Sequence, residues 1–310
     1  MEQFGSIVPT DISYPYWIMQ MNIEALKNKY DFLEVSSIGK SVLNKELYVI
    51  RLGRGPKEVF YSASMHANEW INTPILMKFI ENYAEAYVNN ESIYSQNIRE
   101  LFDKVSIYIE PMVNPDGVDL VVGALNTSST AYRNARTIAS NFPNIPFPNG
   151  WKANILGVDL NLQFPSNWMQ ARENKFAQGF VRPAPRDFVG YGPLTEPESL
   201  AIYNFTLAHN FRLILAYHTQ GRVIFWRYLD LEPDDAENIA KLFAKASGYT
   251  LDDVADTGSF AGYRDWFIDY YGLPGYTVET GQGTNPLPIS EFDSIYQDNI
   301  GIFIIGAQQI

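Results

Sequence analysis

Short apolar runs alternate along the chain with longer stretches in which hydrophobic positions recur at helical spacing. The runs are rich in β-branched and aromatic residues and are bordered by turn-forming residues, which predicts buried strands. The first two runs flank the turn-like segment 39–45 and predict an antiparallel hairpin. The predicted strands cover residues 33–38, 46–52, 59–63, 105–112, 213–217 and 275–278.

Helical periodicity follows several of these runs. Thr73 and Pro74 open a helix whose apolar positions recur three and four residues apart as far as Tyr83. Strands that alternate with helices in this way indicate an α/β fold, in which a mostly parallel sheet is covered on both faces. The other predicted helices lie near residues 196–209, 234–248 and 263–271.

Two stretches between these elements lack periodicity. Asn114 to Gly117 has the composition of a turn, and residues 123–150 are rich in Asn, Ser, Thr and Pro, which predicts a long surface loop of the kind that often borders a functional site. No internal repeat and no linker-like stretch is visible. We therefore expect one domain over residues 1–310, with residues 1–15 as an N-terminal arm.

The composition of the chain excludes several classes of function and of metal site. The net charge of −12 disfavours nucleic acid, because phosphate binding requires clustered Lys and Arg. Zero cysteines mean that any metal must be held by nitrogen and oxygen ligands. The apolar stretch from Ile300 to Ala307 is too short to span a bilayer, so we expect no membrane insertion. Residues 1–5 carry no export signal, and the sequence leaves open a cytoplasmic enzyme or an exported one whose signal is missing here.

Three histidines are present, and two of them follow predicted buried strands. His66 and His218 lie directly after such strands, and Glu279 ends a third. In open α/β sheets, ligands gather beyond the carboxyl ends of the strands. His209 falls near the end of a predicted helix, where a histidine is ordinary, and we give it no role.

The spacing of these residues suits a metal site. His66 and Glu69 are three positions apart, so both side chains can face one point in a tight loop or first helical turn. Two histidines and a glutamate with an open fourth position are a standard catalytic zinc arrangement, and His218 is the candidate third ligand. Taken alone, a His-x-x-Glu pair usually lies on the surface by chance and has no function. His218 alone could be a hydrogen-bonded histidine at the end of a core strand, and Glu279 alone could be a surface or helix-capping carboxylate.

Seven motifs occur in order along the chain: His66 to Trp70, Val113 to Gly117, Gly157 to Asn161, Gly192 to Glu198, His218, Asp265-Trp266 and Glu279. Together they resemble one enzyme family, the zinc metallocarboxypeptidases of the carboxypeptidase A type. The resemblance implies a three-layer α/β/α sandwich around a mixed, mostly parallel eight-stranded sheet. It implies one Zn²⁺ per chain, held by His66, Glu69 and His218, with Glu279 as the general base. It also implies that Asp159 accepts the other ring proton of His66.

The sequence departs from that family at positions that bind the terminal carboxylate of the substrate in the exopeptidases. Leu162 stands where the exopeptidases carry an arginine, and leucine has no hydrogen-bond donor to offer. Asn68 replaces an arginine beside the metal-binding glutamate, and the segment from Thr257 to Phe260 lacks the expected substrate-covering tyrosine. Ordinary trimming of C-terminal residues is therefore in doubt.

Other strings resemble the bacterial branch that cuts γ-D-glutamyl-diamino acid bonds in peptidoglycan stem peptides. These strings are 68–72, 218–221, 262–266 and 283–288. A diaminopimelate-containing substrate would not need the missing arginine in the same place. Stem peptides are anionic, so positive groups should line the cleft. The candidate substrate-binding residues are Asn161, Thr219, Arg133, Arg136 and Arg222, with a solvated surface position as the alternative for each arginine.

Three functions remain open at this point. The first is a zinc endopeptidase that hydrolyses the γ-D-glutamyl-diaminopimelate bond of stem peptides. The second is a conventional metallocarboxypeptidase with a relocated carboxylate clamp. The third is a catalytically silent peptide-binding protein on the same scaffold, which the intact ligand set and Glu279 argue against.

Overall fold

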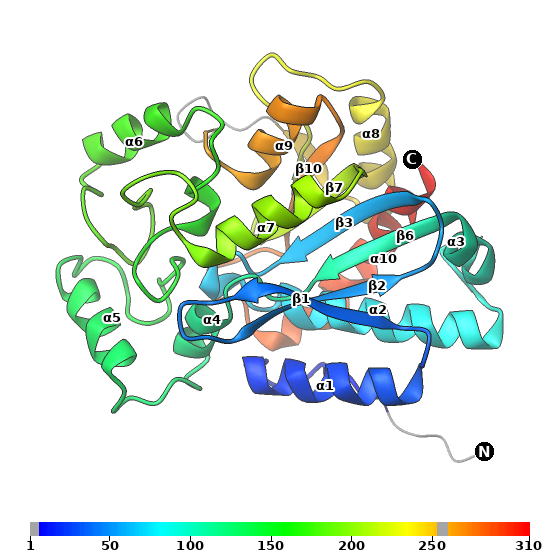
Figure 1. Ribbon diagram of the computed structural model, residues 1–310, viewed down its shortest axis with the longest axis horizontal. Coiled ribbons are helices and arrows are strands. Elements are labelled where there is room, and N and C mark those ends of the chain that lie inside the picture. The colour runs from blue at the N-terminus through cyan, green and yellow to red at the C-terminus, as the bar shows by residue number, and fades with distance from the viewer. Residues whose placement is uncertain (1–5, 253–259) are drawn as a thin grey trace.

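A mixed eight-stranded sheet forms the centre of the molecule (Figure 1). The computed structural model describes residues 6–252 and 260–310. A separate two-stranded ribbon consists of β4 and β5. The strands are β1 (Glu34–Lys40), β2 (Glu46–Leu52), β3 (Lys57–Ala63), β4 (Ser92–Ile93), β5 (Gln96–Asn97), β6 (Val105–Glu110), β7 (Phe211–Thr219), β8 (Val223–Phe225), β9 (Thr250–Asp252) and β10 (Gly275–Thr280).

The strand order in the large sheet is β1-β2-β6-β3-β7-β10-β8-β9. Strands β6, β3, β7 and β10 are neighbours and run parallel, whereas β1 with β2, β2 with β6 and β10 with β8 pair antiparallel. The predicted hairpin and the mixed, mostly parallel sheet are confirmed. The carboxyl ends of the four central strands therefore meet at one edge of the sheet.

Helices cover both faces of this sheet. In Figure 1, α1 and α2 lie below the strands, and α7 and α9 lie above them. The helices are α1 (Tyr16–Lys29), α2 (Asn72–Asn89), α3 (Ile98–Lys104), α4 (Pro115–Val121), α5 (Thr130–Ser140), α6 (Trp168–Ala177), α7 (Pro197–Ala208), α8 (Ala236–Ser247), α9 (Tyr263–Tyr271) and α10 (Phe292–Gln308), with 3₁₀ turns η1 (Ala67–Glu69), η2 (Leu160–Leu162) and η4 (Ile289–Glu291).

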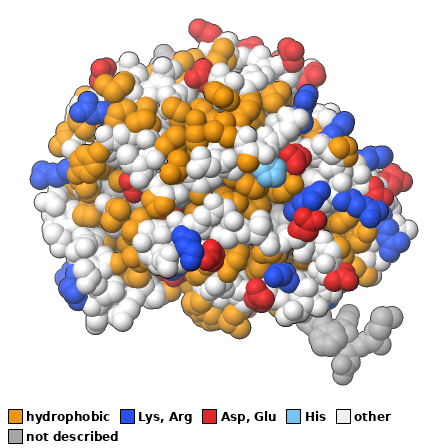
Figure 2. Space-filling view, in the orientation of Figure 1, with side chains coloured by type: hydrophobic (Ala, Val, Ile, Leu, Met, Phe, Trp, Pro, Cys, Tyr) orange, Lys and Arg blue, Asp and Glu red, His pale blue; other side chains and the backbone are white. Residues whose placement is uncertain are grey.

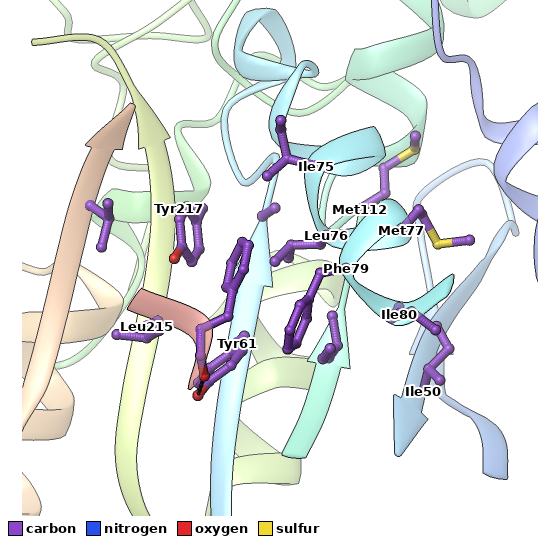
Figure 3. Close-up of a cluster of buried hydrophobic side chains, with 14 of the residues drawn as sticks. Ile50, Tyr61, Ile75, Leu76, Met77, Phe79, Ile80, Met112, Leu215 and Tyr217 are labelled. Atoms are coloured by element: carbon purple, nitrogen blue, oxygen red, sulfur yellow. Dashed lines mark hydrogen bonds between the residues drawn. The ribbon is translucent and has the colours of Figure 1, made fainter. Parts of the chain in front are cut away.

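Alternating side chains of the central strands fill two separate cores. Tyr61 of β3 faces α2 and α10, and its hydroxyl donates to the Phe303 carbonyl at 2.8 Å. Its neighbour Phe60 faces the opposite way and packs among residues of α7 and α9. Figure 3 shows the first core, in which Leu76 and Phe79 of α2 point toward Tyr61 of β3, and Ile80 lies beside Ile50 of β2. Apolar residues on both faces are what a buried parallel strand requires.

The predicted surface loop at 123–150 is wrong in part, because it contains helix α5. The Ser129 hydroxyl caps that helix by accepting from the Tyr132 amide at 3.1 Å. Ala135 and Ala139 form its buried side. These small apolar positions, four residues apart, are concealed in the sequence by the polar residues around them. The predicted turn at Asn114 proves to be the cap of α4, whose Gly117 amide donates to the Asn114 side chain.

The segment ahead of α1 is tied to α2. The amides of Ile7 and Val8 donate to the two carboxylate oxygens of Glu81, at 2.6 and 3.2 Å. Residues 1–5 of the predicted N-terminal arm lie outside the described residues. Across the part of the chain that the structure describes, no helix is both long and apolar enough to cross a bilayer.

One face of the molecule is visible in Figure 2 in the orientation of Figure 1. Hydrophobic side chains gather over its middle, and charged side chains lie mostly toward its rim. Helix α7 contributes exposed leucines, Leu200 and Leu207, to the exposed apolar surface. Isolated exposed leucines are common on soluble proteins, and we attach no function to these.

Candidate metal centre

The parallel strands bring the predicted site residues to one edge of the sheet. His66 follows β3 and precedes the 3₁₀ turn η1, which places Glu69 one turn later. His218 lies in β7, and Glu279 of β10 stands directly beside it in the parallel register. Glu69 and the two histidines are buried. Residues more than 150 positions apart therefore meet, as the sequence predicts.

The three candidate ligands converge on one point. Their ligand atoms lie within 4.8 Å of one another, and over residues 6–252 and 260–310 no other group of three such side chains does so. The Nδ1 atoms of His66 and His218 are 3.2 Å apart. Tetrahedral zinc with nitrogen at about 2.0–2.1 Å separates two imidazole nitrogens by roughly 3.3 Å. The donor set therefore fits zinc.

Glu69 completes this set. Its carboxylate oxygens lie 2.9 Å from the Nδ1 atoms of His66 and His218, one oxygen to each ring. The Thr219 amide donates to Glu69 Oε2 at 3.2 Å, which helps to orient the carboxylate. Burial alone would raise the pKa of Glu69, but His66, Lys152 and His218 outweigh it and hold that pKa well below its usual value. The carboxylate is thus in the ionised form that binds a cation.

Asp159 fixes the orientation of His66. Its Oδ1 lies 3.1 Å from His66 Nε2, and its carboxylate also accepts the amides of Asn161 and Asp187. A hydrogen bond from Nε2–H leaves the Nδ1 lone pair free for a metal. Burial would lower the pKa of His66, but Glu69 and Asp159 raise it to about 9. Burial is the larger effect at His218, whose pKa is lowered.

Glu279 adjoins the ligands. Burial raises its pKa to about 8, and the carboxylate of Glu69 adds to the effect. Lys152, His66 and Arg264 act in the opposite direction. The side chain lines two cavities, one of about 750 Å³ and one of about 210 Å³. Because Glu279 lines both cavities, its carboxyl group can contact a molecule bound in either one.

Lys152 is a site residue that the sequence interpretation missed. Its Nζ lies 2.8 Å from Glu69 Oε1, its side chain is 17% exposed, and it lines both cavities. Burial would lower the pKa of Lys152, but Glu69 and Glu279 raise it, so the amine is charged. The positive groups predicted from the sequence are all arginines, whereas the cation at this site is a lysine that follows Trp151.

The predicted substrate-binding residues divide into two groups. Asn161 lines the smaller cavity and Thr219 the larger one. Arg133, Arg136 and Arg222 line neither cavity.

The three arginines have other surroundings. Arg133 and Arg136 are exposed on α5, and Arg222 pairs with Asp298 at 3.2 Å. The cations that do line the smaller cavity are Lys152, Lys175, Arg186 and Arg264.

The structure locates one of the positions that depart from the family pattern, and another lies outside the described residues. Leu162 lines the smaller cavity, so the position of the absent arginine is inside the site. The residues from Thr257 to Ser259, where a covering tyrosine was expected, lie outside the described residues.

A two-histidine, one-glutamate set beside the half-buried carboxyl of Glu279, at the carboxyl edge of a parallel sheet, is the site of a zinc-dependent hydrolase. The sequence agrees: it matches the zinc carboxypeptidase family over residues 19–301, and the chain belongs to that family. It is accordingly a zinc metallopeptidase with one zinc site.

Relatives support this assignment, and a solved structure shows that the fold is shared. The γ-D-glutamyl-L-diamino acid endopeptidase 1 of Lysinibacillus sphaericus is 45% identical over 294 residues, which cover 95% of this chain and 72% of that protein. The uncharacterized protein YqgT of Bacillus subtilis (strain 168) is 39% identical over 92% of this chain and 74% of its own length. The crystal structure of thrombin-activatable fibrinolysis inhibitor has a TM-score of 0.78 at 19% identity, covering 99% of this chain and 77% of that one, which shows the shared fold.

Proposed function

We propose that this metallopeptidase hydrolyses the bond between γ-D-glutamate and the diamino acid of peptidoglycan stem peptides. The observation that carries the proposal is a complete zinc site whose smaller cavity presents Leu162 where an exopeptidase needs an arginine. The relative from Lysinibacillus sphaericus, named for this activity, supports the same substrate class.

In this proposal His66, Glu69 and His218 hold the zinc, and Asp159 fixes the ring of His66. Zinc, when bound, lowers the pKa of a water molecule and polarises the scissile carbonyl. Glu279 removes the proton from the attacking water and then delivers it to the leaving amine. Its raised pKa suits a group that must first accept and then release a proton near neutral pH.

Lys152 is proposed to stabilise the negative charge that develops on the carbonyl oxygen. It is a half-buried cation that lines both cavities, and its Nζ lies 2.8 Å from Glu69 Oε1. A fixed positive group in a partly dry site is worth more than the same group in water.

Product analysis on defined peptides tests the activity. The zinc-loaded protein is expected to release L-Ala-γ-D-Glu from L-Ala-γ-D-Glu-meso-diaminopimelate, with kcat/KM roughly 10²-fold above that for an ordinary L-peptide C-terminus. Liquid chromatography with mass spectrometry identifies the products. Faster trimming of L-peptides would instead support the conventional carboxypeptidase, and binding without turnover the silent binder.

Replacing Lys152 with methionine is expected to lower kcat by about 10²–10³-fold while zinc stays bound. Methionine keeps the length of the side chain and removes its charge. Steady-state kinetics and zinc content are measured on the same sample. Lys175→Met removes a cation from the wall of the same cavity, where Lys175 pairs with Asp187, and should cost far less. Equal losses in the two variants would mean that Lys152 acts only through the general charge of the cavity.

A further inference from the structure

The larger cavity gathers positive charge in a protein whose net charge is −12. Among the described residues that line it, Lys152 and Arg186 are cations and Glu279 is the one acid. A concave surface on which one sign of charge predominates concentrates ligands of the opposite sign. The larger cavity is therefore suited to a ligand that carries an anionic group.

Arg186 lies where the two cavities meet. The residues that line both cavities are Lys152, Arg186, Phe225 and Glu279. Since Glu279 is the proposed general base, the scissile bond lies at this junction, and Arg186 borders it. The proposed mechanism uses Lys152 and Glu279 and gives Arg186 no part.

Contacts on one side hold the Arg186 guanidinium in place. Its Nε donates to Asp187 Oδ2 at 2.6 Å. Asp187 Oδ1 in turn accepts from Lys175 at 2.5 Å, and the Asp187 amide donates to Asp159 Oδ2 at 3.1 Å. Because Asp159 also bonds His66, the segment that carries Arg186 is tied to the metal site. The guanidinium is thus anchored through its Nε.

The two terminal nitrogens of Arg186 remain available to a ligand. Within residues 6–252 and 260–310, no group accepts a hydrogen bond from Nη1 or Nη2. The side chain is 42% exposed, so a ligand can reach these donors without displacing a protein group. The planar fork of a guanidinium presents parallel donors to a carboxylate, which the amine of a lysine does not. Arg186 is therefore suited to bind a carboxylate at the edge of the larger cavity.

The two cavities divide the substrate at the scissile bond. Leu162 occupies the position where the exopeptidases bind a terminal carboxylate, and it lines the smaller cavity, so the leaving residue belongs there. The acyl side of the substrate then occupies the larger cavity, of about 750 Å³. In the proposed substrate the acyl residue is D-glutamate joined through its γ-carbonyl. Its α-carboxylate is consequently free and lies a few bonds from the carbonyl that is attacked.

We infer that Arg186 binds the free α-carboxylate of the γ-linked D-glutamate on the acyl side of the bond. The inference rests on the proposed function and deepens it. An ordinary peptide has no such group, because the α-carboxyl of its acyl residue is part of the bond that is cut. The subsite also distinguishes γ-linked D-glutamate from γ-linked D-isoglutamine, whose α-carboxyl is an uncharged amide.

Two substrates that differ only in this group test the inference. L-Ala-γ-D-Glu-meso-diaminopimelate and its D-isoglutamine counterpart are compared with the zinc-loaded wild-type protein and with Arg186→Gln. The wild type should prefer the carboxylate by about 10–50-fold in kcat/KM, because the amide cannot form the charge-assisted hydrogen bonds. Arg186→Gln should lower that ratio to near unity. Arg182→Gln removes the same charge from an exposed position that lines neither cavity, and it should keep the ratio.

The separate kinetic constants distinguish this role from catalysis. The α-carboxylate carries the same charge in the ground state and in the transition state, so Arg186→Gln should raise KM for the carboxylate substrate and leave kcat nearly unchanged. Lys152→Met should instead lower kcat for both substrates alike. If Lys152→Met abolished the preference and Arg186→Gln kept it, the carboxylate would bind Lys152 and the inference would be wrong.

Failure of the inference can be told apart from failure of the proposed function. Equal cleavage of both substrates by the wild type, or an unchanged ratio in Arg186→Gln, overturns the role of Arg186 and leaves the proposed activity standing. Cleavage of neither stem peptide refutes the proposed activity itself.

Inhibition of the wild-type protein gives a second measurement that needs no variant. The acyl product L-Ala-D-Glu is compared with L-Ala-D-isoglutamine, which keeps the γ-carboxylate and carries an amide in place of the α-carboxylate. Tighter inhibition by L-Ala-D-Glu supports the subsite, and equal inhibition overturns it. The Arg186→Lys variant keeps the charge and loses the planar fork, so it should retain part of the preference.

Discussion

Replacement of Glu279 by glutamine is expected to leave zinc bound and to lower kcat by about 10²–10⁴-fold. Glutamine has nearly the shape of glutamate and can still donate and accept hydrogen bonds, but it cannot take a proton from water. The strand that carries it should be undisturbed, because β10 is held by its backbone pairing with β7 and β8. The measurement combines steady-state kinetics on a stem peptide with zinc content per chain.

The matched control is Glu100→Gln, the same substitution at an exposed position of α3. This variant should behave like the wild type in both measurements. If Glu279→Gln kept full activity, Glu279 would have no part in the proton transfers. If it lost zinc as well as activity, the carboxyl would be acting on the metal site rather than on water.

The position of the ligand set could be predicted because it follows from simple sequence features. His66 and His218 each come at the end of an apolar run, and Glu279 ends a third such run. The runs pair in parallel, so their carboxyl ends share one edge. The polar residues at the strand ends therefore lie close together, however many residues separate them along the chain.

The residues that line the cavities were harder to predict. Lys152 lies in a segment without periodicity, and Arg264 lies at the start of α9 beside Asp265. In the sequence, Arg264 resembles any arginine next to an acid, and only its burial and its unpaired Nη1 set it apart. Arg222 lies near the His218 motif in the sequence, but its side chain forms an ion pair with Asp298 and lines neither cavity. Side-chain direction in loops depends on tertiary packing, which local patterns do not encode.

The same limit explains two of the helices that the sequence analysis did not predict. Helix α5 has few apolar residues, so its buried side consists of small alanines that a search for large hydrophobic positions overlooks. Helix α10 has the opposite character, since its second half, residues 301–307, is buried all round and has no polar face to mark its period. Both become evident once neighbouring elements are in place to cover them.

Zinc retention should fall in steps from the wild type to Asp159→Asn and then to His218→Ala. The wild-type protein is expected to hold about one zinc per chain, and Asp159→Asn should bind zinc about 10–100-fold more weakly. A neutral amide oxygen accepts the His66 Nε2 proton more weakly than a carboxylate does, and the NH₂ group of asparagine would face a backbone amide that Asp159 accepts. His218→Ala removes a ligand and should lose the metal entirely on dialysis against a chelator that leaves the wild type loaded. His209→Ala, whose ring pairs with Glu58, provides the matched control and should retain zinc.

Thermal unfolding with and without added zinc distinguishes lost binding from a damaged fold. A metal that binds only the folded state raises the melting temperature, so zinc should stabilise the wild type and His209→Ala and leave His218→Ala unchanged. The zinc-free melting temperatures should be similar, because His218 is held in β7 by the strand pairing on both sides. Full zinc content in His218→Ala would place the metal elsewhere and would remove the basis of the proposed chemistry.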